Sequence, residues 1–434
     1  MKTKALRLYG KKDLRLEEFE LPPIGEEELL VKVISDSLCM SSYKSASQGA
    51  EHKRVPDDVA QNPTIIGHEF AGEIIGVGAR LKGRYTEGGR FSIQPAMRGT
   101  YQAAGYSFPF LGGDTQYAVI PKCYIDQDCV LPYSGDAWFY ASMSEPISCV
   151  IGATHASYHT EVGDYTHHMG IRAGGKMAAL AAAGPMGLAL IDYVIHSDRR
   201  PSLLVVTDID EARLARAASI LTAEEAERHG VRLVYLNTST VGDPVYALRE
   251  AADRGGAGGG GSRVGDGIGG GGFDDVFALA PVPAVVEQAD AILAHDGCLN
   301  FFAGPSDQAF SAKFNFYNVH YNATHIVGTS GGNTDDMREA LELSAAGRIN
   351  PAILVTHIGG LDAAREATLH LPEIPGGKKL IYTHISLPLT AIADFREAGV
   401  KNPIFAELDR LCERSGRLWN GDAERFLLEN AEPI

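Results

Sequence analysis

The chain has 434 residues, and 45% of them are hydrophobic. Because a single core rarely grows beyond about 250 to 300 residues, we expect two domains. The 39 basic and 55 acidic residues give a formal net charge of −16. This charge argues against a protein that binds nucleic-acid backbones or anionic membranes, since both need clustered positive charge. The first ten residues contain no apolar stretch of signal-peptide type, so we expect a cytoplasmic protein.

The cysteines and the longest apolar stretch argue against two further classes of protein. The six cysteines are spread along the chain without the two-residue gap of a structural zinc knuckle, so we expect neither a disulfide scaffold nor a four-cysteine zinc loop. The apolar stretch 177–195 is long enough for a membrane span, but two glycines, a proline and Asp192 interrupt it. A strand, a turn and a helix explain it better.

The predicted elements change in kind along the chain. Residues 1 to about 165 hold short alternating segments between Gly/Pro turns, such as 28–34 and 72–77, which predict a β-rich domain with few helices. After these, apolar runs of strand length alternate with helix-like stretches, a pattern typical of a parallel, doubly wound sheet. The predicted strands of this sheet are 177–182, 203–207, 233–236, 275–279, 298–303 and 324–328. A helix over 335–346 and a strand over 353–356 follow.

Twelve of the eighteen residues between 255 and 272 are glycine, a composition that buries too little apolar surface to order itself. A phosphate-binding loop has a similar composition. However, this segment directly precedes the strand 275–279, and loops that enter strands lie at the edge of the sheet opposite to the dinucleotide crevice. We therefore predict a flexible surface insertion.

A turn typical of dinucleotide-binding sites follows the first strand of this sheet and opens a helix. Its sequence, Ala182-Ala183-Gly184-Pro185-Met186-Gly187, has the A-x-G-x-x-G form. In this form Gly184 lets the backbone approach a pyrophosphate, and Gly187 lets the helix pack against the strand. Asp208 lies 21 positions after Gly187, at the end of the next strand, where a carboxylate accepts hydrogen bonds from the adenosine ribose. Together these features predict a dinucleotide site.

The same aspartate indicates which coenzyme binds. Asp208 would repel a 2′-phosphate, which favours NAD(H), although Arg213, five residues further on, leaves NADP(H) possible. The candidate cofactor residues, which include four at or after the ends of later strands, are Gly184, Pro185, Met186, Gly187, Asp208, Arg213, Ala280, Ala303, Gly304 and Ser330.

Four side chains of the β-rich part are candidate metal ligands: Cys39, His68, Glu69 and Glu145. One thiolate, one imidazole and carboxylate oxygens suit a catalytic zinc that keeps one position open for substrate. Taken singly, each residue has an ordinary structural explanation, since an isolated cysteine is usually buried packing and a lone histidine or glutamate is usually hydrogen-bonded or solvated. Spacing alone leaves the metal site undecided.

The surrounding motifs carry a family resemblance. The run Gly67-His68-Glu69-x-x-Gly72-x-x-x-Gly76-Val77-Gly78, the earlier Cys39, the pair Glu145-Pro146 and the dinucleotide turn with Asp208 resemble the zinc-dependent medium-chain dehydrogenases, in particular the sorbitol dehydrogenase branch. The resemblance covers nearly the whole chain and is greatest to the L-sorbose 1-phosphate reductases. The segments that carry this finer likeness are 37–42, 48–53, 300–305, 315–322 and the extension after 379–382.

The resemblance implies an α/β fold with two domains. The predicted parts are a β-rich GroES-like catalytic domain, 1–165, completed by 330–384; a Rossmann domain with a doubly wound parallel sheet, 166–329, which contains the Gly-rich insertion 255–272; and a helical C-terminal extension, 385–434. In the extension, Ile404, Leu408 and Leu411 share one helix face. We expect this part to pack on the body of the protein.

The resemblance also implies roles for single residues. Cys39 and His68 are zinc ligands, while Glu69 and Glu145 share the remaining role, one binding directly and the other through water. Ser41 matches the hydroxyl that passes the alcohol proton outward.

Two departures from the family pattern concern the metal. Ser42 stands where many relatives have an aspartate that orients the zinc-bound histidine, which puts the support of that histidine in question. The four-cysteine zinc loop is absent, and the sequence shows no second cluster of ligands, so we predict one zinc per chain.

The reaction that the resemblance implies is the reduction of L-sorbose 1-phosphate to D-glucitol 6-phosphate. Zn²⁺ polarises the C2 carbonyl, the nicotinamide delivers hydride, and Ser41 helps supply the proton. Two alternatives stay open: an NAD-dependent polyol dehydrogenase that acts on unphosphorylated sugar alcohols, and a non-catalytic dinucleotide-binding protein. The resemblance also suggests a homo-oligomer, either a dimer or a tetramer.

A basic group follows Cys39 closely in this acidic chain: Lys44, His52, Lys53 and Arg54. Charge alone favours a solvated surface patch. However, the segment leaves the predicted metal site directly, and charge-assisted bonds to phosphate are strong. We expect at least one of the two lysines and the arginine to bind the substrate phosphate, although Lys44 is also placed to contact the cofactor.

Overall fold

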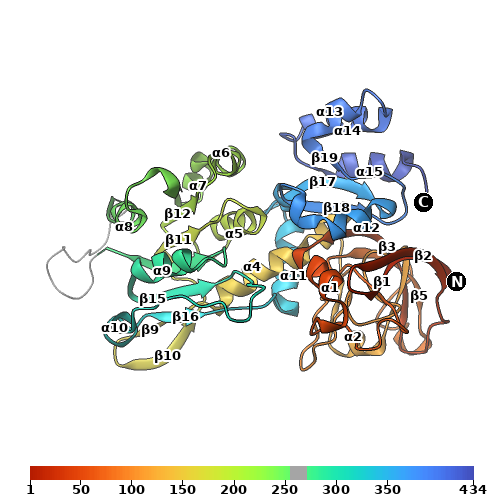
Figure 1. Ribbon diagram of the computed structural model, residues 1–434, viewed down its shortest axis with the longest axis horizontal. Helices are drawn as coiled ribbons and strands as arrows, with labels where there is room; N and C mark the ends of the chain where they lie inside the picture. The colour runs from red at the N-terminus through yellow and green to blue at the C-terminus, as the bar shows by residue number, and fades with distance from the viewer. Residues whose placement is uncertain (255–270) are drawn as a thin grey trace. The chain divides into compact units, whose positions relative to one another are not determined.

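The computed structural model describes residues 1–254 and 271–434 of the protein. The predicted Gly-rich insertion, 255–272, lies almost entirely outside the described residues. The chain divides into two compact units (Figure 1). The first unit comprises Met1–Pro146 and Asn333–Ile434, and the second unit comprises Ile147–Gly332. Among the described residues, no helix has both the length and the apolar character that a membrane crossing needs.

The second unit is built on a six-stranded sheet with the strand order β13-β12-β11-β14-β15-β16, in which all neighbours are parallel. Its strands, with the hairpin that precedes them, are β9 (Tyr158–Glu161), β10 (Asp164–Met169), β11 (Lys176–Leu180), β12 (Leu203–Asp208), β13 (Arg232–Asn237), β14 (Phe273–Ala278), β15 (Leu293–Phe301) and β16 (His325–Val327). Its helices are α5 (Pro185–His196), α6 (Glu211–Ile220), α7 (Ala223–Arg228), α8 (Pro244–Arg254), α9 (Pro283–Ala291) and α10 (Phe316–Tyr321). The predicted doubly wound sheet is confirmed.

The apolar runs in the sequence form strands because the sheet is buried on both faces. All six residues of β12 are buried, as expected of a parallel strand between two layers of helices. On one face, Leu248 of α8 and Val286 of α9 pack with Val205 and Val276 of the sheet. The continuous Val/Leu-rich pattern therefore specifies burial on both sides of the sheet.

The second unit begins earlier than the predicted boundary at residue 165. The hairpin β9–β10 belongs to it, because His159 Nε2 lies 3.2 Å from Asp275 Oδ1 on β14. The backbone N–H of Thr160 also donates to Asp296 on β15 at 2.9 Å. The alternating pattern of the hairpin resembles that of the β-rich part, and these long-range polar contacts show that the hairpin, a separate two-stranded sheet, belongs to the second unit. The helix α4 (Ser144–Ala156) crosses the boundary.

The first unit contains an eight-stranded sheet and a three-stranded sheet. Its strands are β1 (Lys2–Gly10), β2 (Asp13–Glu20), β3 (Leu29–Leu38), β4 (Thr64–Ile65), β5 (Ala71–Val77), β6 (Arg90–Ile93), β7 (Tyr117–Ile120), β8 (Val130–Pro132), β17 (Val355–Gly360), β18 (Lys378–Tyr382) and β19 (Thr390–Ala391). Its helices are α1 (Met40–Gln48), α2 (Lys122–Asp126), α3 (Trp138–Ser142), α11 (Thr334–Ala345), α12 (Leu361–Leu369), α13 (Phe395–Ala398), α14 (Pro403–Glu413) and α15 (Gly421–Asn430). The β-rich prediction for this part is confirmed.

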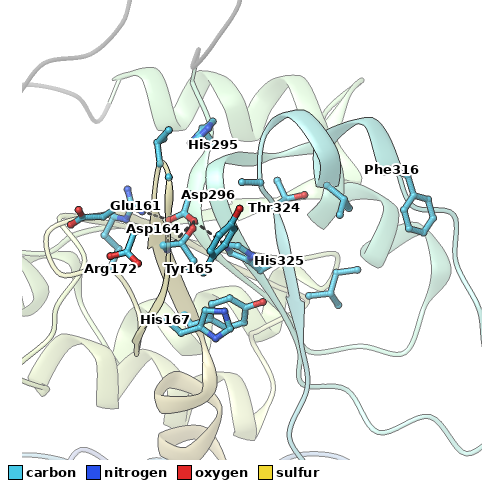
Figure 2. Close-up of a pocket in the computed structure, with 17 residues that line it drawn as sticks. Glu161, Asp164, Tyr165, His167, Arg172, His295, Asp296, Phe316, Thr324 and His325 are labelled. Carbon is cyan, nitrogen blue, oxygen red and sulfur yellow. Dashed lines mark hydrogen bonds and ion pairs between the residues drawn. The ribbon is translucent and has the colours of Figure 1, made fainter.

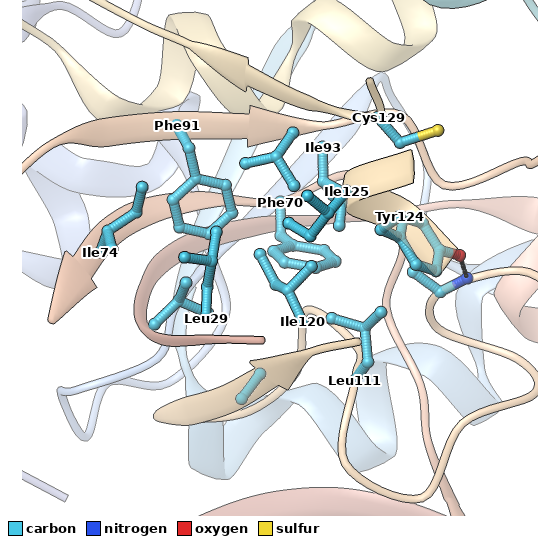
Figure 3. Packing of buried hydrophobic residues seen from close by; sticks show 14 of the residues in the cluster. Leu29, Phe70, Ile74, Phe91, Ile93, Leu111, Ile120, Tyr124, Ile125 and Cys129 are labelled. Atoms are coloured by element: carbon cyan, nitrogen blue, oxygen red, sulfur yellow. Dashed lines mark hydrogen bonds between the residues drawn. The ribbon is translucent and has the colours of Figure 1, made fainter. Parts of the chain in front are cut away.

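One hydrophobic core of the first unit is formed by residues of β3, β5, β6 and β7 with the loops beside them (Figure 3). Leu29 and Ile120 are completely buried there. The rings of Phe70 and Phe91 meet edge to face, with centroids 6.3 Å apart. Each such side chain contributes about 1.5 to 3 kcal/mol by leaving water, so this core fixes the loop that precedes β5.

Two C-terminal segments differ from the sequence expectation. The strand expected over 353–356 begins at Val355, because Asn350 and Pro351 start a short 3-10 helix over Pro351–Leu354. The extension 385–434 is part of the first unit instead of a separate part. The helix expected around residues 404–411 is present as α14, which buries Leu408 and Leu411.

Glu424 on α15 anchors the extension. Its carboxylate accepts the backbone N–H groups of Trp138 (2.6 Å) and Phe139 (2.9 Å) at the start of α3, and the Tyr382 hydroxyl (2.8 Å). Burial raises the pKa of Glu424 from 4.5 to about 7. The folded protein therefore binds this proton more tightly than the unfolded chain does.

We predict that Glu424→Ala destabilises the protein by about 2 to 4 kcal/mol, because two buried N–H groups lose their acceptor. Urea unfolding measures this loss, and the exposed Glu429 of the same helix provides the matched control, Glu429→Ala.

The raised pKa of Glu424 also makes the stability of the protein depend on pH. The stabilisation that the protonated Glu424 carboxyl adds to the folded state is complete below about pH 4.5 and is lost as the pH rises through about 7. The stability difference between wild type and Glu424→Gln should shrink over that range, and a difference independent of pH would contradict the assignment.

Candidate active site

Three of the four predicted metal ligands lie together in the first unit. Cys39 is the N-cap residue of α1, and His68 and Glu69 lie just before β5. Their ligand atoms all lie within 4.8 Å of one another. The hydroxyl of Ser41 is 3.7 Å from the Cys39 sulfur. The structure therefore gathers one thiol, one imidazole, one carboxylate and one hydroxyl at one place.

A glycine and an aspartate shape the loop that carries two of these ligands. Gly67 has a φ of +88°, and a Cβ at this position would collide with the carboxylate of Asp36 on β3. The same carboxylate accepts the backbone N–H of Glu69 at 3.0 Å. The glycine in the Gly-His-Glu motif is thus required by the backbone conformation and by the close approach of Asp36.

Two hydroxyl groups contact the ring of His68. Ser42 Oγ lies 3.2 Å from Nδ1, and the Tyr106 hydroxyl lies 3.1 Å from Nδ1 and 3.3 Å from Nε2. Burial lowers the pKa of His68, which favours the neutral imidazole that a metal requires. Ser42, the departure from the family pattern named in the sequence, therefore contacts the histidine through its hydroxyl.

Lys378, the first residue of β18, completes the group and was missed in the sequence. Its ammonium group donates to Glu69 Oε1, and both side chains are buried. Burial by itself would lower the pKa of Lys378, but Cys39 and Glu69 outweigh it and raise that pKa. No local pattern marks this lysine, because its partner lies 309 positions earlier in the chain.

Glu145, on α4, lies outside the group of three, but the charges of that group affect its pKa. The pKa of Glu145 is raised to about 7, chiefly by burial and also by the negative charge of Glu69, while His68 acts in the opposite direction. Burial also raises the pKa of the Cys39 thiol. These acidic groups outnumber the one charge that Lys378 supplies beside them, and such an excess of acidic groups suits a divalent cation.

The donor set fits zinc. A cysteine sulfur, a neutral imidazole and a carboxylate are the ligand types of catalytic zinc sites, which leave a fourth position for substrate. While Oε1 of Glu69 is bound by Lys378, Oε2 is buried and has no hydrogen-bond partner among the described residues. This oxygen is available to a metal. Whether Glu69 or Glu145 binds the metal directly stays a prediction.

The sequence expectation that the chain holds no second cluster is wrong. The described residues contain another group of three candidate ligands, His196, Glu225 and His229, in the second unit. The sequence did not show it because residues 29 positions apart come together only when α5 and α7 fold onto the sheet.

The predicted dinucleotide turn lies between β11 and α5. Gly184 is the N-cap residue of α5, with Pro185 and Met186 in the first turn, and a Cβ on Gly184 would meet no protein atom within 4 Å. A Cβ on Gly187 would instead overlap with the backbone of Ala182. Glycine is therefore needed at the two positions for different reasons. At Gly184 it leaves open space for a ligand, and at Gly187 it allows close packing of the helix against the strand.

Asp208 ends β12 beside this turn. Its carboxylate accepts the backbone N–H groups of Ala183 (3.1 Å), Ile209 (2.9 Å) and Asp210 (3.1 Å). About one of its four acceptor positions remains for a ribose hydroxyl. The Arg213 side chain is 63% exposed and pairs with Asp210 at 3.4 Å. A positive charge therefore lies near the edge of the sheet at which β12 ends. The remaining candidates follow the ends of β14, β15 and β16 at the same edge of the sheet: Ala280, Ala303, Gly304 and Ser330.

Two of the basic residues that follow Cys39, His52 and Arg54, lie beside Tyr106. The His52 ring stacks on the Tyr106 ring with centroids 5.7 Å apart, and the Arg54 guanidinium lies 5.3 Å from the same centroid. Burial and, in decreasing order, the positive charges of Arg54, Lys53 and Lys44 together lower the pKa of His52 to about 4. Of the predicted phosphate cations, Arg54 therefore lies next to the tyrosine whose hydroxyl contacts His68.

A cavity of about 760 Å³ opens in the second unit between the hairpin β9–β10 and the strands β15 and β16 (Figure 2). At its centre Asp296 accepts from Arg172 at 2.6 Å and from the Thr160 N–H at 2.9 Å, and it lies 2.8 Å from His325 Nε2. These groups satisfy one another, and no predicted site residue lines the cavity. The network holds the hairpin to the sheet and is not the candidate active site.

Comparison with known proteins identifies the family. Residues 25–127 match the alcohol dehydrogenase GroES-like domain, and residues 185–346 match the zinc-binding dehydrogenase domain. The chain belongs to the zinc-binding dehydrogenase family. The predicted family and the two-domain α/β fold, with a GroES-like and a Rossmann part, are confirmed.

Two relatives and one solved structure resemble this dehydrogenase. Mannitol-1-phosphate 5-dehydrogenase of Aliivibrio fischeri is 51% identical, with 98% of this chain and 97% of the relative covered. L-sorbose 1-phosphate reductase of Klebsiella pneumoniae is 46% identical, with 100% and 98% covered. The crystal structure of 2R,3R-butanediol dehydrogenase from Bacillus subtilis has a TM-score of 0.67 at 21% identity, with 88% of this chain and 99% of that chain covered. This last likeness shows the fold.

We predict that the isolated dehydrogenase holds one tightly bound zinc per chain at the site of Cys39, His68 and Glu69. Cys39→Ala should lose this zinc and reduce activity by about a hundredfold or more, because the metal polarises the reacting carbonyl. Elemental analysis after dialysis and a nicotinamide absorbance assay measure both effects. Cys123→Ala, which changes a half-buried cysteine elsewhere in the unit, serves as control. Full zinc content and activity in Cys39→Ala would show that the site is misassigned.

Proposed function

We propose that this dehydrogenase transfers hydride between NAD(H) and C2 of a ketose phosphate, and that its substrate pair is L-sorbose 1-phosphate and D-glucitol 6-phosphate. The observation that carries the proposal is the position of Arg54 beside the ring of Tyr106, whose hydroxyl contacts His68, in a chain of net charge −16. An anionic group on the substrate would find charge-assisted hydrogen bonds there. A neutral polyol needs no such cation.

The residues of the site divide the chemistry between them. When bound, zinc would polarise the carbonyl and the nicotinamide would supply the hydride. Ser41 is placed to pass a proton to the substrate oxygen, because its hydroxyl lies beside Cys39. Ser42 and Tyr106 orient the ring of His68, and this kind of support for a metal-binding histidine typically changes affinity or activity by about 10- to 100-fold.

The names of the two relatives distinguish two positions for the phosphate. In L-sorbose 1-phosphate the reacting C2 is next to the carbon that bears the phosphate. Oxidation of mannitol 1-phosphate at C5 places the reacting carbon about four carbons away from it. Arg54 lies near the ring of Tyr106, whose hydroxyl contacts His68. This proximity to the metal ligands favours the first arrangement.

A panel of substrates tests the proposal against the polyol dehydrogenase alternative. Matched free and phosphorylated sugars, L-sorbose with its 1-phosphate and D-mannitol with its 1-phosphate, are compared with both coenzymes. The proposal expects the highest kcat/KM for L-sorbose 1-phosphate. Equal use of free and phosphorylated sugars would support a polyol dehydrogenase, and preference for mannitol 1-phosphate would place the phosphate at the far end. The expected dimer or tetramer stays a prediction.

We predict that NADH is the preferred coenzyme, because the Asp208 carboxylate suits a ribose diol and repels a 2′-phosphate. Asp208→Ser should shift the ratio of kcat/KM for NADH and NADPH toward NADPH by about tenfold, the equivalent of about 1.4 kcal/mol. Arg213→Ala is the companion variant and should lower the use of NADPH. A wild type that strongly prefers NADPH would show that Arg213 outweighs the carboxylate.

We predict that Arg54→Ala lowers kcat/KM for L-sorbose 1-phosphate about ten- to a hundredfold, because a charge-assisted bond to phosphate is lost. Activity toward free L-sorbose should change little. Lys82→Ala removes an exposed cation outside the group and should change neither activity. If Arg54→Ala reduces both substrates equally, the arginine supports Tyr106 instead of the phosphate, and Lys44→Ala and Lys53→Ala decide whether either lysine has the phosphate role.

A further inference from the structure

A second group of metal-ligand side chains lies in the second unit, outside the candidate active site. His196 is the last residue of α5, Glu225 lies in the first turns of α7, and His229 directly follows that helix. The ligand atoms of the three lie within 4.8 Å of one another. Their side chains are 15%, 37% and 33% exposed, respectively, so the group is open to solvent.

The distances suit a metal held by two imidazoles and a carboxylate. His229 Nε2 lies 3.1 Å from Glu225 Oε1, and His196 Nε2 lies 3.9 Å from the same oxygen. In a tetrahedral zinc site with bonds of about 2.0 to 2.1 Å, neighbouring ligand atoms are about 3.3 Å apart. The three atoms therefore need small side-chain rotations to surround a cation.

The contacts of Nδ1 of His196 with Asp192 fix the orientation of the imidazole ring. Its Nδ1 lies 2.8 Å from the backbone oxygen of Asp192 and 3.0 Å from the Asp192 carboxylate. Both partners are acceptors, so Nδ1 carries a proton, and Nε2 is the nitrogen that faces Glu225. A carboxylate or carbonyl behind the histidine is the usual support of a metal-binding imidazole.

Glu225 is also held in place. Its backbone N–H donates to the Thr222 hydroxyl at 3.1 Å, which caps α7. Arg228 binds Oε2 at 2.5 Å and leaves Oε1 directed at the two histidines. The arginine adds a positive charge that weakens cation binding, although it is 71% exposed and therefore screened by water. This site should bind a metal more weakly than the buried site in the first unit.

We propose that His196, Glu225 and His229 form a second binding site for a divalent transition-metal cation such as Zn²⁺, Ni²⁺ or Cu²⁺. The cation links the C-terminal end of α5 to α7 and so cross-links two helices on the nucleotide-binding sheet. Its role is structural, because neither helix end carries a residue of the predicted coenzyme site. Binding to the folded state alone stabilises the protein by mass action.

The test counts zinc ions on the tag-free full-length protein at pH 8. The pH matters because the hydrogen bond with Asp192 raises the pKa of His196, so protons compete with the metal at lower pH. Equilibrium dialysis against Zn²⁺, followed by elemental analysis, should give two zincs per wild-type chain at saturation. One of them should be removed by a brief treatment with a weak chelating resin.

The variants assign the weaker zinc. His196→Gln and His229→Gln should each weaken its binding at least tenfold and abolish the rise in thermal midpoint that added Zn²⁺ causes, while dehydrogenase activity stays unchanged. His320→Gln, which changes an exposed histidine on α10, should behave as wild type. Cys39→Ala should keep the weaker zinc. Retained activity in the two histidine variants also shows that they are folded.

Two results would overturn the proposal: a wild type that binds only one zinc, or a second zinc that remains with equal affinity in both variants. If a variant fails to fold, the proposal is tested on the wild type instead, by adding Cu²⁺ to the zinc-loaded protein. An electron paramagnetic resonance spectrum with coupling to two imidazole nitrogens supports the site, and the absence of bound Cu²⁺ refutes it.

Discussion

The buried ion pair between Lys378 and Glu69 is the contact on which the candidate active site depends. A thiol and two carboxylates lie in this buried region, and uncompensated charges there are costly. Lys378 provides a positive charge from a segment that follows the whole second unit in the chain. The pairing of β18 with β3, in which Lys379 lies opposite Leu38, brings this lysine beside Cys39. The sheet register thus places the charge that the metal ligands require.

Near this ion pair, basic side chains gather in one segment of an otherwise acidic chain. The chain as a whole is acidic, yet four basic side chains follow Cys39 and three of them act on His52. Tyr106 connects the two regions, because its ring contacts His52 and Arg54 while its hydroxyl contacts His68. A substrate with an anionic end and a polar reacting end would match these two regions.

In the second unit, polar groups are mostly engaged with the protein itself. Asp296 binds the β9–β10 hairpin to the sheet through hydrogen bonds from Thr160 and Arg172. Asp208 accepts three backbone N–H groups and keeps little free capacity. The solvent-open group around Glu225 differs, since its histidine nitrogens face a shared oxygen. This difference distinguishes a metal-binding candidate from polar groups that only hold the fold together.

The sequence by itself determined the features that depend on neighbouring residues. Apolar runs gave the strands of the parallel sheet, and the spacing of Gly184, Gly187 and Asp208 gave the nucleotide turn, because strand, turn and helix follow one another directly. Lys378 and the group around Glu225 were decided only by the tertiary structure. Their partners lie 309 and up to 33 positions apart, and strand register or helix packing brings them together. The boundary at Pro146 also follows from long-range contacts of His159, which no local pattern contains.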